Sequence, residues 1–141
     1  MEPTPNPPRV IFHGPGHVRA AMRAAREAGT ALILQSAPGA AAYLGAPFFQ
    51  QFIEMARDEF PDVHVIGVLD CGPNAGFALA AIREGIDRIR IDAPPDVRKK
   101  FEEMALEAGS SVDDSDESAL DLLTEADPLA ACRAWFGQAG D

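Results

Sequence analysis

The chain has 141 residues, of which 47% are hydrophobic, and a formal net charge of −10. This length suits one domain with its own core, so we expect a disordered, Pro-rich tail over residues 1–8 and a single α/β domain over residues 9–141. The acidic balance makes nucleic acid and membrane surfaces poor partners, because their phosphates carry the same sign of charge. We expect neither a signal peptide nor a membrane span, and the two cysteines have no disulfide or zinc-finger spacing, which predicts a cytoplasmic protein with reduced thiols.

Short apolar runs alternate along the chain with segments of helical periodicity. The apolar runs predict strands at residues 9–13, 31–34, 63–69 and 88–91, with a weak fifth strand at 110–112. The periodic segments predict helices at about residues 18–28, 47–60, 75–84, 97–108 and 128–136. Asn74 and Asp96 are the expected N-caps of the third and fourth of these helices, and Ser118 and Asp121 have the spacing of a capping box before a further helical start. Residues 38–45 and the acidic residues 113–117 are expected to form loops, the second one solvated.

Strands that are separated by helices favour a mainly parallel sheet of four or five strands with right-handed crossovers. Two architectures fit this rhythm. One is a segment of a β/α barrel, with the strands in the order 1-2-3-4, and the other is a flavodoxin-like three-layer sheet, with the order 2-1-3-4-5.

The carboxyl ends of parallel strands share one edge of the sheet, and ligands bind at that edge. The residues that we expect there as ligand-binding candidates are His13, Gly14, Gly16, His17, Ser36, Gly39, Gly72, Asn74 and Asp92. Gly14-Pro15-Gly16, ahead of a helix, can present backbone N–H groups to an anion or can simply turn the chain.

Asp70 and Cys71 are the candidate catalytic residues. A carboxylate directly after an apolar strand transfers protons, caps a helix or accepts backbone N–H groups, and these roles stay open for Asp70. Cys71 is either a nucleophile, with His13 or His17 as its base, or an inert core thiol. No compact ligand motif is present, so no cofactor is expected; if zinc binds, its expected ligands are His13, His17 and Cys71. Cys132 lies on an apolar helix face and is expected in the core.

Three segments within residues 17–92 resemble the N-terminal part of the class II, metal-dependent fructose- and tagatose-bisphosphate aldolases. Residues 31–39, Ala-Leu-Ile-Leu-Gln-Ser-Ala-Pro-Gly, are similar to the second strand of that family and the small-residue loop after it. Residues 65–72, which end Leu-Asp-Cys-Gly, are similar to a strand of the family that ends Leu-Asp-His-Gly, and residues 80–92 are similar to the helix and strand that follow.

The resemblance implies part of a β/α barrel and, for the family, cleavage of a ketose phosphate with a bound zinc. In the family motif the Asp moves protons and the His binds the metal. Asp70 matches the proton-moving Asp, and Cys71 stands where the metal-binding His is expected. The later barrel strands, which carry the other metal ligands and the phosphate loops, have no counterpart here. We therefore expect no aldolase activity. We expect instead that a small metabolite or a protein partner binds at the carboxyl edge of the strands.

Two other functions stay open. One is a small metal- or cysteine-dependent lyase or hydrolase with Asp70 as the proton-transfer residue, and the other is a pure interaction protein. A half-barrel also leaves apolar strand faces and edges open. We expect either a homodimer or the C-terminal segment from Ser110 onward to cover them.

Overall fold

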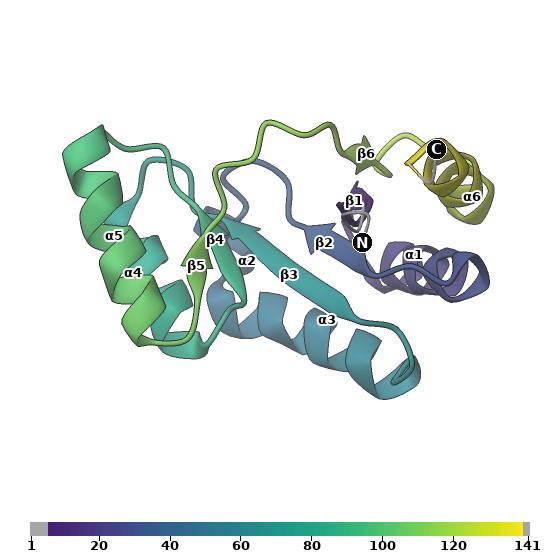
Figure 1. Ribbon diagram of the computed structural model, residues 1–141, viewed down its shortest axis with the longest axis horizontal. Helices are drawn as coiled ribbons and strands as arrows, with labels where there is room; N and C mark the ends of the chain where they lie inside the picture. Colours follow the sequence, from purple (N-terminus) through teal and green to yellow (C-terminus); the bar gives the residue numbers. More distant parts are fainter. Residues whose placement is uncertain (1–5, 140–141) are drawn as a thin grey trace, which may run out of the picture.

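The computed structural model describes residues 6–139. Its strands are β1 (Arg9–Ile11), β2 (Leu32–Gln35), β3 (Val65–Asp70), β4 (Arg88–Arg90), β5 (Ser111–Val112) and β6 (Leu120–Asp121). Its helices are α1 (Pro15–Ala28), α2 (Ala41–Leu44), α3 (Ala46–Glu59), α4 (Ala75–Glu84), α5 (Pro95–Glu107) and α6 (Pro128–Ala139). The strands form one sheet in the order β5-β4-β3-β2-β1-β6, and every neighbouring pair is parallel (Figure 1). The parallel α/β fold is thus confirmed. Strands β1 to β5 follow the consecutive order of a barrel segment instead of the flavodoxin-like order, and the sixth strand, β6, lies beside β1.

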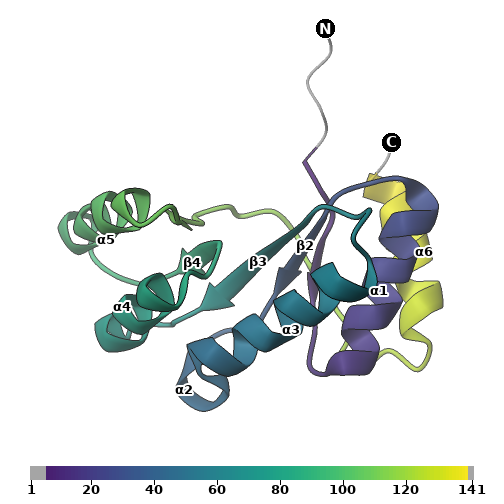
Figure 2. The same ribbon diagram turned by 90° about the horizontal axis from the view of Figure 1, so that it is seen from below.

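The helices cover one face of the sheet, and an extended segment crosses the other (Figures 1 and 2). Gly67 shows which face is which, because a Cβ atom there would meet the Ile53 side chain of α3 at 2.8 Å. Side chains alternate along a strand, so Asp70 and the residues in register with it point away from the helices. These residues form the inner face, which also carries Arg9, Gln35, Arg88 and Arg90.

Local signals fix the ends of several helices. Gly29 and Gly85 follow α1 and α4 in the left-handed conformation, with φ of 66° and 85°, and their N–H groups bond back to the last turn. The Asn74 side chain accepts a hydrogen bond from the N–H of Phe77, so the predicted cap of α4 is confirmed. The prediction that Asp96 caps α5 was wrong, because Pro94 stands at the N-cap position and Asp96 lies inside the first turn. Pro95 is the first residue of this helix, where proline is favoured because its missing N–H costs nothing.

Two further local predictions were wrong. Residues 41–44, expected in a loop, form the short helix α2. The capping-box spacing of Ser118 and Asp121 does not start a helix, because Leu120–Asp121 is strand β6. A strand of two residues is too short to show the alternation that identifies strands in a sequence, so only its pairing with Val10 and Ile11 reveals it.

The C-terminal segment covers one open side of the sheet, which is one of the two alternatives that the sequence left. After β5 the chain crosses the inner face through residues 113–119, which we call the strap, and β6 then pairs with β1 (Figure 1). Helix α6 packs against α1 beyond it (Figure 2). The strands at the two edges, β5 and β6, are only two residues long, which limits pairing with other chains.

The N-terminal residues fall into two groups. Residues 1–5 of the expected tail lie outside the described part of the chain. Pro8 is buried, and its carbonyl accepts the N–H of Ile33 at 2.9 Å, which extends the pairing of β1 with β2.

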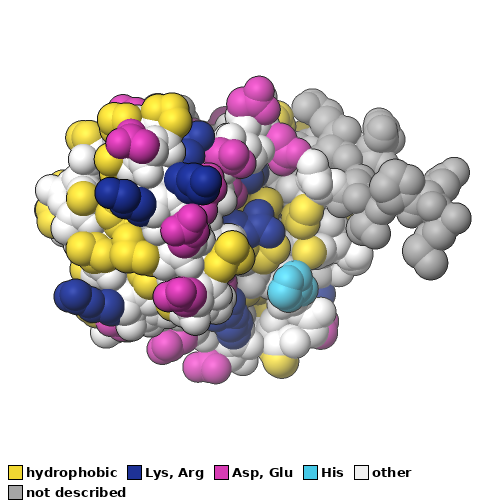
Figure 3. All heavy atoms as spheres, turned by 60° about the vertical axis from the view of Figure 1, so that its left-hand side comes forward, with side chains coloured by type: hydrophobic (Ala, Val, Ile, Leu, Met, Phe, Trp, Pro, Cys, Tyr) yellow, Lys and Arg dark blue, Asp and Glu magenta, His cyan; other side chains and the backbone are white. Residues whose placement is uncertain are grey.

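The face over α4 and α5 carries charges of both signs. In Figure 3, Lys and Arg side chains lie among Asp and Glu side chains and hydrophobic ones, so the negative net charge is not gathered on this face. Within residues 6–139, every helix is too short or too polar to cross a membrane.

Candidate functional site

The carboxyl edge of the sheet collects the side chains that the sequence singled out, in two groups. Ser36 follows β2 and lies between the groups. Its hydroxyl accepts the N–H of Asp70 at 2.9 Å, and it lines a small cavity of about 60 Å³ together with His13. The parallel sheet therefore brings the ends of β1, β2 and β3 together as predicted.

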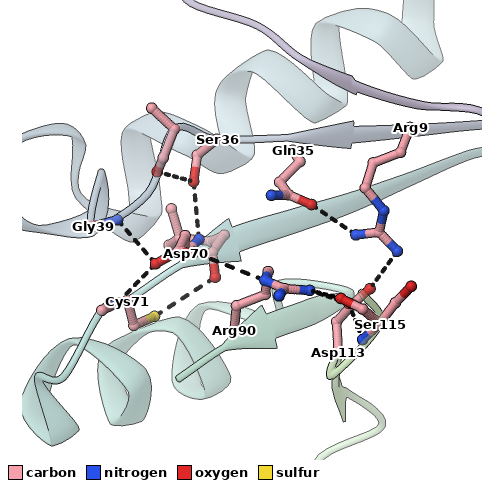
Figure 4. A network of polar contacts seen from close by, with 12 residues as sticks. Arg9, Gln35, Ser36, Gly39, Asp70, Cys71, Arg90, Asp113 and Ser115 are labelled. Atoms are coloured by element: carbon pink, nitrogen blue, oxygen red, sulfur yellow. Dashed lines mark hydrogen bonds and ion pairs between the residues drawn. The ribbon is translucent and has the colours of Figure 1, made fainter. Parts of the chain in front are cut away.

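Asp70, the last residue of β3, holds two glycine loops. Its Oδ1 atom accepts the N–H of Gly39 and the N–H of Gly72, each at 2.9 Å (Figure 4). Both glycines have positive φ, 68° and 56°, which other residues rarely adopt. The Oδ2 atom lies 3.8 Å from Nε of Arg90. Both oxygens of the carboxylate therefore have partners within the chain.

Cys71 is turned into the core. The residue is 2% exposed, and its Sγ lies 3.8 Å from the carbonyl oxygen of Leu69. Burial, together with the charge of Asp70, raises the pKa of this thiol to about 12. A thiol in this environment stays protonated at neutral pH, and it is a poor nucleophile and a poor metal ligand.

His13 and His17 form a second group at the end of β1. Nε2 of His13 lies 2.7 Å from Oδ1 of Asp121. The backbone N–H of His13 donates a hydrogen bond to Nδ1 of His17 at 3.0 Å. Desolvation, followed by the charge of His13, lowers the pKa of His17 against the opposing effect of Asp121. Burial would raise the pKa of Asp121, but the Leu123 N–H and His13 outweigh it and the pKa is lowered. His13 thus ties β6 to the end of β1.

The remaining predicted residues have local roles. Gly14 is the N-cap residue of α1 and Gly16 lies in its first turn. Asn74 caps α4. Asp92 is exposed after β4, and its N–H donates to the carbonyl of Gly72 at 2.9 Å.

The donor set does not fit a zinc ion. His13 and His17 lie together, but the buried Cys71 thiol faces the Leu69 carbonyl. Within residues 6–139 the structure brings together no group of three or more His, Cys, Asp or Glu side chains that could hold a metal ion. A zinc site needs at least three protein ligands in contact with the ion.

Asp70 also lines a polar cavity of about 260 Å³. The cavity lies at the ends of β3 and β4, and its lining residues are Asp70, Arg90, Ile91, Asp92, Arg98, Asp113 and Asp114. Nε of Arg98, in the first turn of α5, is buried without a hydrogen-bond partner among the described residues. Of the seven lining residues, our sequence analysis named only Asp70 and Asp92 for the site.

A buried ion network lies next to this cavity on the inner face (Figure 4). Arg9 donates to Gln35 at 2.7 Å and to Asp113 at 3.1 Å, and Arg90 reaches Asp113 at 2.7 Å. Burial alone would raise the pKa of Asp113, but the charge and hydrogen bond of Arg9, the Ser115 N–H and Arg90 outweigh it and lower the pKa. The expectation that residues 113–117 form a solvated loop was wrong for Asp113, because its side chain is 2% exposed.

The sequence contained one signal for this network. Arg9 stands at the start of an apolar strand, where a charge needs a partner. The partner could not be identified, because 104 positions separate Asp113 from it.

Comparisons with known proteins agree with this geometry. The family model for class II fructose-bisphosphate aldolase matches residues 8–104, which extends the resemblance at both ends. The fructose-bisphosphate aldolase of Xanthobacter flavus is 33% identical over 75 residues, which are 53% of this chain and 21% of that protein. The figures are the same for the enzyme of Pseudomonas aeruginosa. The chain thus spans about a fifth of the length of these relatives.

Solved structures show the same fold. A fructose-1,6-biphosphate aldolase structure from Coccidioides immitis matches with a TM-score of 0.63 and 15% identity, over 77% of this chain and 40% of that one. The YdjI aldolase of Escherichia coli K12 matches with a TM-score of 0.59 and 16% identity, over 81% and 48%. The family match over residues 8–104 and the consecutive parallel strands agree, and the chain belongs to the class II fructose-bisphosphate aldolase family.

Proposed function

We propose that this chain is a non-cleaving member of the class II aldolase family that binds a small polar metabolite at the carboxyl edge of its sheet. The observation that carries the proposal is the state of Cys71, which stands at the position of the family's metal-binding histidine. Its thiol is buried, and its pKa is raised to about 12. Zinc binds the thiolate, so the ion would have to pull this side chain out of the core and ionise it.

The role of Asp70 supports the same proposal. Asp70 lines the polar cavity, but both oxygens of its carboxylate already have partners within the chain. In this chain Oδ1 binds the N–H groups of Gly39 and Gly72, and Oδ2 faces Arg90. These contacts give Asp70 the structural role of holding the loops after β2 and β3 together.

The polar cavity beside Asp70 is the proposed ligand site. It lies at the carboxyl edge of parallel strands, where ligands of such sheets bind. Its volume of about 260 Å³ suits a small molecule, and Arg98 supplies a guanidinium Nε without a partner among the described residues. A phosphate oxygen can accept from this donor, and the carboxylates of Asp92 and Asp114 in the lining can accept hydrogen bonds from sugar hydroxyls.

Metal content and turnover test the loss of cleavage. The purified chain is assayed for bound zinc after dialysis against the ion and for cleavage of fructose 1,6-bisphosphate. We expect substoichiometric zinc and no turnover. Stoichiometric zinc that is lost in a Cys71→Ala variant, or turnover that is lost in an Asp70→Asn variant, would overturn the proposal in favour of a metal-dependent lyase.

Thermal stability tests the ligand site. We expect a panel of sugar phosphates to contain a compound that raises the melting temperature of the chain, and we expect Arg98→Met to abolish the shift. Lys99→Met is the matched control, because Lys99 is the exposed neighbour in α5 and does not line the cavity. A panel without any shift, or equal shifts in both variants, rejects the pocket.

A further inference from the structure

Three guanidinium groups on the inner face surround one carboxylate of the strap. Asp113 lies 3.1 Å from Arg9, 3.6 Å from Arg88 and 2.7 Å from Arg90. Arg88 and Arg90 are two positions apart on β4 and point to the same side, whereas Arg9 comes from β1 on the far side of β2 and β3. We call these three residues the arginine cradle.

The positive charge of the three cradle arginines exceeds the negative charge of the carboxylates that contact them. Three cations face Asp113, and the only other carboxylate in ion-pair range among the described residues is Asp70, which lies 3.8 Å from Arg90. The side chain of Arg9 is 3% exposed, and its Nε has no hydrogen-bond partner within residues 6–139. A buried cation without full compensation is costly. The cradle therefore provides more positive charge and more donors than one carboxylate can use.

The strap has a single buried anchor in this cradle. Among residues 113–119, only Asp113 is buried, and the others are exposed or half-buried. Cavities of about 260 Å³ and 180 Å³ both border Asp113, and they are lined by Arg90 and Arg88 respectively. Two of the three cradle arginines thus face open space beside Asp113.

We propose that the arginine cradle is a binding site for a phosphate-type oxyanion, and that the Asp113 carboxylate occupies it until such an anion replaces it. A phosphate dianion offers more charge and more acceptor oxygens than a carboxylate, and guanidinium groups bind it in a bidentate manner. Its arrival releases Asp113 and loosens the strap, which Arg90 also holds through the carbonyl of Ser115 at 2.9 Å. The cradle shares Arg90 and Asp113 with the lining of the proposed ligand pocket, but Arg9 and Arg88 lie outside that lining, so the inference goes beyond the pocket.

Titration with inorganic phosphate tests the cradle. Calorimetry compares the chain with an Asp113→Asn variant, with chloride used to keep the ionic strength constant. We expect the variant to bind phosphate roughly tenfold more tightly or better, because the competing charge is gone, and we expect Arg9→Met in the same background to remove this gain. Equal affinities in the chain and the variant would overturn the proposal.

A surface carboxylate gives the matched control. Glu27 also lies between two arginines, 2.8 Å from Arg133 and 3.4 Å from Arg23, but this group is exposed. Glu27→Gln should leave phosphate affinity unchanged. A gain equal to that of Asp113→Asn would show that freeing any arginine pair attracts phosphate, and it would reject the cradle.

Hydrogen exchange in the unaltered chain gives a second test, which holds even if Asp113→Asn does not fold. The Ser115 N–H donates to Oδ1 of Asp113 at 3.2 Å, so its exchange rate reports on the anchor. We expect phosphate, but not chloride at equal ionic strength, to accelerate exchange at Ser115. An unchanged rate at saturating phosphate would overturn the displacement of Asp113.

Discussion

The side chains of Arg9 and Asp113 form an ion pair at 3.1 Å across 104 positions of sequence. Arg9 opens the first strand, and Asp113 begins the segment that leaves the fifth. Their contact spans the inner face of β2, β3 and β4, which lie between β1 and β5 in the sheet (Figure 4). It fixes the path of the strap, which in turn delivers β6 to the edge of β1.

Truncating Asp113 and truncating Arg9 should lower the free energy of unfolding by unequal amounts. Asp113→Ala leaves Arg9 buried without its counter-charge, and we expect a loss of about 3–5 kcal/mol in the free energy of unfolding. Arg9→Met leaves Asp113 paired with Arg90, so we expect a smaller loss, below about 3 kcal/mol. Urea denaturation of both variants measures the difference. A larger cost for Arg9→Met would contradict this account of the network.

Acid should weaken the fold through Asp113. Its pKa in the folded chain lies below the ordinary value of 3.8, so the unfolded chain binds the proton first. The stabilisation is complete above the ordinary value and is lost as the pH falls through the lower folded pKa. We expect the difference in unfolding free energy between the chain and Asp113→Asn to shrink as the pH falls below about 4. A difference in unfolding free energy that stays constant down to strong acid would contradict a lowered pKa of Asp113.

His17 should produce a second pH effect nearer neutrality. Its folded pKa is lowered, first by desolvation and then by His13. The unfolded chain therefore takes up the proton first as the pH falls below the ordinary value of 6.5, and the fold loses stability there. Protonation also ends the role of Nδ1 as acceptor for the His13 N–H. The melting temperatures of the chain and of His17→Gln should converge as the pH falls below about 6.5. A constant difference between the two melting temperatures would show that His17 does not cause the loss of stability.

Gly67 should tolerate no larger side chain. An added Cβ would meet Ile53 at 2.8 Å and Phe49 at 3.2 Å, where α3 rests on β3. We expect Gly67→Ala to cost about 1–3 kcal/mol by overpacking. Gly16→Ala is the control, since a Cβ there meets nothing within 4 Å, and we expect no loss of stability. Chemical denaturation compares the two variants, and equal stabilities would show that α3 can shift away.

Both thiols should be unreactive in the folded chain. Burial raises the pKa of Cys71 and of Cys132 to about 12, with smaller contributions from Asp70 and Glu125. We expect a thiol reagent at about pH 8 to modify neither residue on the time scale on which it modifies the unfolded chain. Mass spectrometry after timed labelling locates the modified residue. Rapid labelling of folded Cys71 would point to a nucleophile instead of a core thiol.

The sequence by itself determined the elements that depend on local patterns. Apolar runs and helical spacing predicted the four main strands and the helices between them, and glycines such as Gly29 and Gly85 marked the helix ends. Helices between strands make the sheet parallel, so the shared edge with His13, Ser36 and Asp70 followed as well. The Leu-Asp-Cys-Gly segment at residues 69–72 also led to the correct family.

Only the tertiary structure decided how the polar groups are used. Whether Asp70 moves protons or holds loops depends on the N–H groups of Gly39 and Gly72, which the chain brings to it from two separate turns. Strand β6 and the anchor of the strap depend on pairing with residues at the opposite end of the chain. Hydrogen bonds and ion pairs act over a few ångströms in space and leave no periodic trace in the sequence, so long-range partners become visible only in the folded chain.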